Sequence, residues 1–392
     1  GASIELYNPA NDTSYFLSFQ KKIQGLAIQA TLPNEKTSFE GAGALVKGKF
    51  HSNEIQVQEG NQGPYKLTGP LNEIFLLIVS GSERIYANGR LLERGEDKDY
   101  TMDYNAGELL FSSKFPITSE TRILAEFQYT ENNYTRFVVY GSATHSEEKF
   151  SFTTYAYSEK DAKNQPLQQT LTDDQKKALS LAGDDPKLHT VDSSIPLEYN
   201  SNRALYSKEV VDGKTVYVYA TNPEEQLYEV RFQWVGSNQG NYRQQTDTAA
   251  GRIFEYIAPI NEIPQGDFSP NIPLTTPKLL EILGIQASYY PSKNTWVEME
   301  LSSSNNDLNL FSNKDKQDDK GVAAHVTFKK NTPIDNWNID VFGTYDYVHQ
   351  DYRNLEGLYQ VEFNRDWNLT NGITGNQHFV QSGFSRLHPK KG

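Results

Sequence analysis

The feature that most constrains the fold of this chain is a period-two alternation of apolar and polar residues. The segment TWVEMELS (295–302) alternates valine, methionine and leucine with two glutamates. GVAAHVTFKK (321–330) and NWNIDVFGTYDYVHQ (336–350) repeat the pattern. Successive side chains of a strand point to opposite faces of a sheet, so the alternation predicts strands with one apolar and one polar face.

Composition agrees with strands and excludes several kinds of site. The 24 Tyr and 20 Phe favour β structure. The absence of Cys excludes disulfides, thiolate metal sites and cysteine nucleophiles. A net charge of −13 argues against nucleic-acid binding. The sequence has no apolar run of about 20 residues for a transmembrane helix. The start GASIELYNPAND is not a signal peptide. Whether a signal peptide has been removed in front of Gly1 stays an open question.

Helical signals are weak except in one segment. Thr172 and Gln175 have the spacing of a capping box, and Gly183 is placed to end a helix. The sequence therefore predicts a helix over 173–182. A second short helix or 3₁₀ turn is expected at 276–283.

Turn dipeptides divide the rest into short strands. Asn88-Gly89 and Asp212-Gly213 are hairpin turns between apolar runs, and Asn105 to Gly107 form a third turn. Strands spaced every 8–12 residues over 73–130 predict an immunoglobulin-like β-sandwich. Further strands are expected at 14–19, 25–32, 43–50 and 54–60.

A Gln-Gly-x-aromatic motif occurs three times. Its glycines, Gly63, Gly240 and Gly266, fit positions with positive φ or without room for a Cβ. We interpret the motif as a corner where a loop feeds a strand, because no polar partner repeats around it. The prediction is that the glycines lie in turns, together with Gly89 and Gly107, and that Tyr65, Tyr242 and Phe268 are buried.

These signals predict an all-β chain of five parts. The fold class is immunoglobulin-like β-sandwich modules followed by antiparallel strands that resemble part of an outer-membrane β-barrel, with one short helix. The parts are an N-terminal antiparallel region (1–72), the sandwich (73–145), a linker with the helix (146–189), a second β-domain (190–277) and barrel-related antiparallel strands (278–392).

Two interpretations of the last part stay open. Its segments have roughly the 9–11 residues that cross an outer membrane, but an ordinary half-solvated sheet alternates in the same way. At most about six strands fit there, whereas a closed membrane barrel needs at least about eight. Either the chain is the N-terminal part of a longer protein, or this part is soluble.

A family resemblance supports the first interpretation. Residues 40–134 contain Gly63-Pro64-Tyr65, Gly81-Ser82-Glu83-Arg84, Asn88-Gly89, Arg94-Gly95-Glu96-Asp97, Asp103-Tyr104-Asn105 and Gly107-Glu108. This stretch resembles a module of large exported cell-envelope proteins of Bacteroidetes-type bacteria, and later segments look like continuations of the same proteins. In them, β-sandwich modules precede an outer-membrane β-barrel. The resemblance implies a location in the cell envelope, at the outer membrane or cell surface, and an architecture; it implies no reaction.

No catalytic constellation is found in the sequence. The seven His lack zinc-site spacing, and GxSxG and P-loop motifs are absent. The sequence therefore suggests no catalytic residue and no cofactor-binding residue. One loop has a density of oxygen ligands that suits Ca²⁺, although EF-hand spacing is missing and a solvated loop explains it as well. The candidate calcium ligands are Asp307, Asn309, Asp315, Asp318 and Asp319.

Two functional hypotheses follow. The first is a non-enzymatic envelope or outer-membrane protein, a structural or accessory subunit of a surface assembly. It would bind other envelope proteins by surface complementarity and strand-edge pairing, with outer-membrane contact through 285–392. The second is a surface protein that binds or hydrolyses glycans. Its candidates for stacking on sugars are Trp234, Trp296, Trp337 and Trp367. The partner, any ligand and the oligomeric state are not determined by the sequence.

Overall fold

The computed structural model describes residues 4–7, 14–17, 20–46, 48–70, 76–130, 134–166, 171–220, 222, 224–248, 251–334, 337–369 and 374–387. The chain is all-β, as predicted, with antiparallel sheets and little helix. It divides into two compact units. The first comprises 1–170, 277–310 and 315–392, and the second comprises 171–276 and 311–314.

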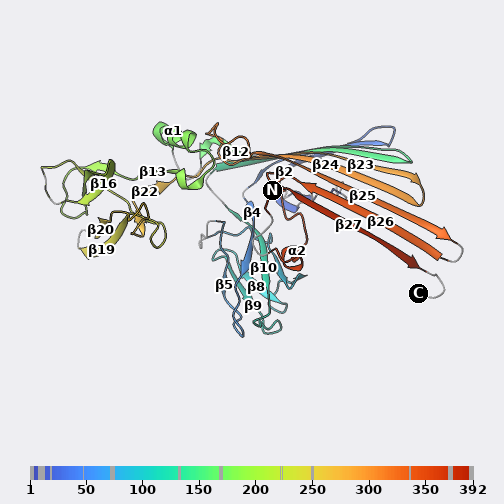
Figure 1. The fold of residues 1–392 in the computed structure, drawn as a ribbon, viewed down its shortest axis with the longest axis horizontal. Coiled ribbons are helices and arrows are strands. Elements are labelled where there is room, and N and C mark those ends of the chain that lie inside the picture. Colours follow the sequence, from blue (N-terminus) through green and yellow to red (C-terminus); the bar gives the residue numbers. More distant parts are fainter. Residues whose placement is uncertain are drawn as a thin grey trace. The chain divides into compact units, whose positions relative to one another are not determined.

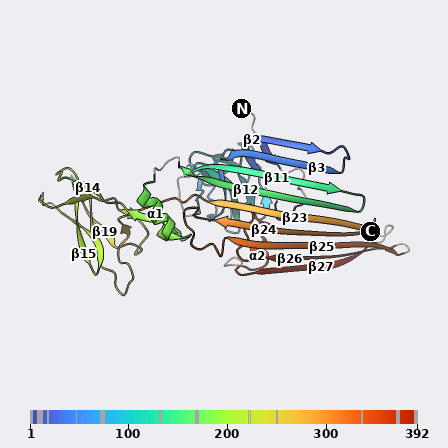
Figure 2. The same cartoon turned by 90° about the horizontal axis from the view of Figure 1, so that it is seen from above.

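The first unit is built around one long antiparallel sheet of ten strands (Figure 1). The strand order is β1-β2-β3-β11-β12-β23-β24-β25-β26-β27, and Figure 2 shows the strands from β2 to β27 side by side. Their bounds are β1 Ile4–Tyr7, β2 Gln20–Thr31, β3 Thr37–Val46, β11 Tyr134–Ser146, β12 Phe150–Pro166, β23 Leu279–Ser292, β24 Thr295–Asp307, β25 Lys320–Ile334, β26 Trp337–Val348 and β27 Gln377–Leu387.

This sheet corrects the predicted division of the chain. β3 pairs with β11, and β12 pairs with β23, so three separate segments form one sheet. The parts 1–72 and 278–392 are therefore not independent, and the linker expected from 146 contains β12. The sandwich ends before β11 and not at 145. Local patterns missed this arrangement because both pairings join strands separated by about 90–120 residues, across an inserted module.

The helix or turn expected at 276–283 is wrong. Residues from Leu279 onward form β23, which pairs with β12 through Leu279↔Lys160 and Leu283↔Ala156. Pairing on both sides, to β12 and β24, fixes this segment as a strand despite its run of leucines.

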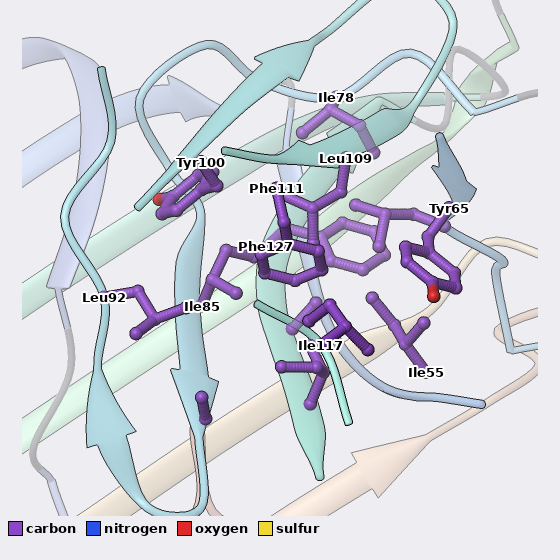
Figure 3. Packing of buried hydrophobic residues seen from close by; sticks show 14 of the residues in the cluster. Ile55, Tyr65, Ile78, Ile85, Leu92, Tyr100, Leu109, Phe111, Ile117 and Phe127 are labelled. Carbon is purple, nitrogen blue, oxygen red and sulfur yellow. The ribbon is translucent and has the colours of Figure 1, made fainter. Parts of the chain in front are cut away.

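The module inserted between β3 and β11 is a sandwich of a four-stranded and a three-stranded sheet, ordered β4-β10-β6-β7 and β5-β9-β8. Its core contains Ile85 and Phe127 from one sheet and Leu109 and Phe111 from the other, all almost fully buried (Figure 3). The strands are β4 Gly48–Ile55, β5 Tyr65–Lys66, β6 Arg84–Ala87, β7 Arg90–Leu91, β8 Tyr100–Asp103, β9 Glu108–Phe111 and β10 Ile123–Thr130.

The predicted hairpin turns are present. Asn88 and Gly89 have φ of +47° and +80° and join β6 to β7. Gly107, with φ +65°, precedes β9. Asp212 and Gly213, with φ of +50° and +75°, join β15 to β16 in the second unit. Positive φ at these positions is the reason for their Asn, Asp and Gly residues.

The second unit contains three small sheets, ordered β13-β22, β14-β17-β15-β16 and β18-β21-β19-β20. Its aromatic core includes Tyr206, Tyr217, Tyr242 and Phe254. The strands are β13 Thr190–Asp192, β14 Ile195–Leu197, β15 Tyr206–Val211, β16 Lys214–Tyr219, β17 Leu227–Glu229, β18 Gln233–Trp234, β19 Tyr242–Thr248, β20 Gly251–Tyr256, β21 Phe268–Ser269 and β22 Asn271–Pro273.

The predicted helix 173–182 is present as α1 (Asp173–Ala182). Thr172 accepts from the backbone N–H of Gln175, whose side chain accepts from Thr172 N–H, so the capping box is complete. The part of the chain that the structure describes also contains the 3₁₀ helix η1 (Pro186–Leu188) and the short helix α2 (Phe363–Asp366). Among the described residues no helix has the length and apolar character needed to cross a membrane.

The three Gln-Gly-x-aromatic motifs are not one kind of corner. Gly63 has φ +110° and precedes a cis peptide bond to Pro64. The prediction that Gly240 and Gly266 lie in turns is wrong. The two glycines face each other in an antiparallel bridge. A Cβ on Gly240 would lie 2.2 Å from the carbonyl oxygen of Phe268, so close backbone approach is the reason for glycine there. Tyr65 and Tyr242 are buried, and Phe268 is half-buried.

Candidate functional site

One face of the long sheet is apolar and exposed. Leu26 on β2 is 81% exposed, Val139 on β11 59% and Phe384 on β27 80%. Strand registers place apolar side chains of nine strands, all of the sheet except β1, on this same face. We call it the apolar face, and its members include Leu26, Ile28, Phe39, Leu45, Phe137, Val139, Phe152, Leu283, Ile285, Tyr289, Met299, Leu301, Val322, Phe328, Val341, Tyr345, Val380 and Phe384.

The opposite face is largely buried. It carries a buried apolar cluster that includes Tyr140, Tyr157 and Ile282, and beside this cluster a row of polar residues, after which we call it the polar face. A single row of directly paired positions crosses seven strands from β3 to β26, and every position in it is polar. The row consists of Ser38, Thr144, Thr153, Gln286, Glu300, His325 and Asp346. Along this row the sheet has the reverse of the usual arrangement, in which apolar side chains are buried and polar ones are solvated.

Glu300 is the centre of this polar face. Its side chain is 0% exposed and accepts hydrogen bonds from Ser14 Oγ (2.8 Å) and Tyr155 Oη (2.7 Å). The backbone N–H groups of Tyr15 and Phe16 also donate to it, at 2.8 and 3.1 Å. Four donors compensate the cost of burying the carboxylate, and they hold segment 14–17 against the sheet.

The prediction of a strand over 14–19 is wrong for residues 14–17, which are irregular; 18 and 19 lie outside the described residues.

His325 and Asp346 form a second buried contact beside Glu300. Asp346 Oδ1 lies 2.5 Å from His325 Nδ1, and Thr327 Oγ1 lies 2.9 Å from Nε2. The order hydroxyl, imidazole, carboxylate is that of a hydrolase triad. However, all three residues are at most 9% exposed, and the Tyr15 ring stacks on the imidazole at 4.0 Å. A substrate has no access to Thr327 in this arrangement, so the contact is structural.

Segment 351–355 covers another part of the polar face. Tyr352 Oη lies 2.8 Å from Ser302 Oγ, and Leu355 packs with Leu17, Tyr140 and Tyr157. The buried polar face is thus closed by two chain segments, 14–17 and 351–355.

Gly284 makes room for one side chain of this cluster. A Cβ at this position would lie 2.1 Å from the ring of Tyr155. Because Tyr155 donates to Glu300, the glycine on β23 is part of the same arrangement.

The predicted calcium ligands are divided by the structure. Asp307, Asn309 and Asp319 are buried, and the Asn309 N–H donates to Asp307. Asp315 and Asp318 are exposed. The ammonium group of Lys316 lies 2.5 Å from Asp307 Oδ2 and 3.5 Å from Asp319 Oδ2, so a cation of the chain itself neutralises the two buried carboxylates.

The four tryptophans are divided between the two units and differ in exposure. Trp234, in the second unit, and Trp367, in the first, are exposed. Trp296 and Trp337 are half-buried and lie under Lys329 and Arg386, at 5.2 and 3.8 Å from their ring centroids.

Sequence reasoning missed the polar row and the Glu300 cluster. The alternation of β24 and β25 showed that Glu300 and His325 share the polar sides of their strands. It did not show which face is buried, or that Ser14 and Tyr15 lie against Glu300. The spacing of 285 residues between Tyr15 and Glu300 leaves no local signal.

Comparison with protein families finds one match. Residues 50–131 are similar to a family described as Domain of unknown function (DUF8818). The matched range corresponds to the sandwich from β4 to β10, so it delimits that module. No curated protein and no solved structure matches the chain.

Proposed function

We propose that this chain is a non-enzymatic cell-envelope protein whose long sheet contacts the lipid of an outer membrane through its apolar face. The observation that carries the proposal is the inversion of the sheet: Glu300 is fully buried while Leu26 and Phe384 are about 80% exposed. In water, a continuous apolar face over most of ten strands is a strong liability for aggregation. Against lipid, the same face is the stable arrangement.

Strand length supports the proposal. β23 extends from Leu279 to Ser292, thirteen rises of about 3.4 Å, or about 44 Å. A strand of that length tilted by about 40° rises about 34 Å, which is enough to cross the ~25 Å apolar band of outer-membrane proteins. Among the exposed aromatic residues of the apolar face, Phe39, Phe152 and Tyr289 lie in the strand halves nearest the hairpin turns, and Phe137 lies in the opposite half of β11. Aromatic residues are enriched at membrane boundaries.

Protein partners complete the proposal. Within the described residues, β1 and β27 each pair with one neighbour only. Edge strands with free N–H and C=O groups bind further strands by β-addition. We therefore propose that the protein is a structural or accessory subunit, with other envelope proteins as partners of its strand edges and of the sandwich.

The experiment is flotation of the purified full chain with phospholipid vesicles, after dilution from detergent. We expect the chain to float with the vesicles, to resist extraction by high salt, and to aggregate in detergent-free buffer. A monodisperse chain in buffer that stays at the bottom of the gradient would contradict the membrane proposal. Binding of such a chain to an oligosaccharide array would support the glycan hypothesis in its place.

A further inference from the structure

We infer that the apolar face carries a binding site for a zwitterionic phospholipid headgroup, of the phosphoethanolamine class, where β23 begins and β24 ends. This inference rests on the proposed membrane contact and names a lipid for it. The site is a hollow of about 450 Å³, within the usual size of small-ligand pockets. Glu281, Asn305, Lys320 and His349 contribute its polar lining, and Leu283 and Val322 its apolar lining.

The register explains how polar and apolar parts are arranged. Glu281 pairs with Asn305, and Asn305 pairs with Lys320, so the three form one polar row across β23, β24 and β25. The next row on the same face contains Leu283 and Val322, which are 57% and 51% exposed. A polar row directly beside an apolar one is the arrangement expected where a lipid headgroup meets its acyl chains.

The charges of the row suit a zwitterion. Glu281 and Lys320 are separated by two strand spacings, about 9–10 Å between backbones. Asn305 lies between them and donates to Glu281 at 3.0 Å. Among the described residues no carboxylate oxygen lies within 4 Å of Lys320 Nζ. The Lys320 ammonium is therefore available to a phosphate, and Glu281 keeps lone pairs for an ammonium group.

His349 adds a donor on the phosphate side. Its Nδ1 accepts the backbone N–H of Asp351 at 3.3 Å and lies 3.5 Å from Asp351 Oδ2. With Nδ1 as acceptor, the proton of the neutral imidazole is on Nε2. Its own backbone N–H donates to the carbonyl of Val322, which holds the residue at the edge of β25. A primary ammonium headgroup can donate hydrogen bonds to Glu281, whereas a trimethylated one cannot, so the site distinguishes ethanolamine from choline lipids.

The test measures which lipid stays with the protein. The full chain in detergent is mixed with equal amounts of phosphatidylethanolamine, phosphatidylcholine and phosphatidylglycerol of identical acyl chains, purified again, and its retained lipid is quantified by mass spectrometry. We expect severalfold enrichment of phosphatidylethanolamine. Lys320→Gln should lower retention of all three lipids. Glu281→Gln should abolish the preference for ethanolamine over choline. Lys293→Gln, an exposed lysine at the opposite end of the same hairpin, should change nothing.

Flotation of the same variants separates the two proposals. Wild-type chain that floats but retains the three lipids equally would overturn the headgroup site and leave the membrane contact standing. The same conclusion follows if Glu281→Gln keeps the ethanolamine preference. If the chain does not float with vesicles of any composition, both proposals are overturned.

Discussion

Asp346 joins the long sheet to the N-terminal segment through two different oxygens. Its Oδ1 lies 2.5 Å from Nδ1 of His325 on the neighbouring strand, and its Oδ2 accepts the hydroxyl of Tyr15 at 2.7 Å. The Tyr15 ring in turn stacks on the His325 imidazole. With Glu300, which accepts the N–H groups of Tyr15 and Phe16, Asp346 anchors segment 14–17 to the polar face.

Glu300→Gln should loosen this anchor. A glutamine keeps one acceptor oxygen and turns an NH₂ group toward donors, so buried N–H groups lose their partner. We expect the free energy of unfolding to fall by about 2–4 kcal/mol. Hydrogen exchange of the segment containing Tyr15 and Phe16 should accelerate. Denaturant unfolding and exchange mass spectrometry measure both effects.

Glu298→Gln is the matched control for that variant. Glu298 lies two residues earlier on the same face, is half-buried, and accepts hydrogen bonds from the side chains of Ser288, at 3.4 Å, and Gln286. We expect its effect to stay below about 1 kcal/mol, with exchange at Tyr15 unchanged. Equal effects of the two variants would mean that Glu300 does not hold segment 14–17.

Ile285→Lys tests the environment of the apolar face. Ile285 is 47% exposed on β23, and Leu110 is 46% exposed on the sandwich, so the two positions are matched in exposure. If water contacts both side chains, substitution by lysine should change the free energy of unfolding little at either position. If lipid contacts Ile285, Ile285→Lys should cost about 2–4 kcal/mol in vesicles and Leu110→Lys about zero. Unfolding in vesicles, or the fraction of chain that floats, gives the comparison.

Gly284→Ala should disturb the Glu300 cluster through Tyr155. The added Cβ would lie 2.1 Å from the Tyr155 ring, which must move and lose its hydrogen bond to Glu300. We expect the overpacking to lower the free energy of unfolding by about 1–3 kcal/mol. Gly43→Ala on β3 is the control, because no atom lies within 4 Å of its added Cβ. A neutral Gly284→Ala would show that Tyr155 adapts without cost. Thermal unfolding measures the two.

Lys316→Gln tests the candidate calcium loop. In the native chain the Lys316 ammonium group neutralises Asp307 and Asp319, so millimolar Ca²⁺ should leave the melting temperature unchanged. The variant leaves two buried carboxylates without this cation. It should melt lower than the native chain, and Ca²⁺ should restore part of the loss. A calcium-dependent shift in the native chain would instead favour calcium ligation by the loop.

Glu83→Gln should change the pH dependence of the sandwich. Burial raises the pKa of the Glu83 carboxyl above its usual value of 4.5, and nearby Arg94 opposes the shift in part. A raised pKa means that the folded state binds the proton more tightly. The stabilisation is therefore complete below pH 4.5 and is lost as the pH rises through the folded pKa.

Hydrogen exchange of sandwich peptides as a function of pH measures this dependence. We expect protection to fall as the pH rises above about 4.5, after correction for intrinsic exchange rates. In Glu83→Gln the fall should flatten, whereas Glu120→Gln, at an exposed position, should behave as the native chain does. An unchanged profile in the Glu83 variant would show that this carboxyl does not govern the dependence.

Local signals were sufficient for the elements whose causes are local. The helix 173–182 follows from the Thr172–Gln175 capping box, and the turns at Asn88-Gly89 and Asp212-Gly213 follow from residues that tolerate positive φ. The strands of 295–350 follow from alternation. Gly240 and Gly266 show the limit: the sequence indicated small residues, but only the bridge between them explains why.

The sequence by itself determined that the chain is all-β, where most hairpins turn, and that its last strands have one apolar and one polar side. The tertiary structure decided that three distant segments form one sheet, and that its polar side is the buried one. The physical reason is that alternation is symmetric: it separates the two faces of a strand without stating which of them is covered. That choice is made by long-range contacts, above all those of Glu300 with Ser14, Tyr15 and Phe16.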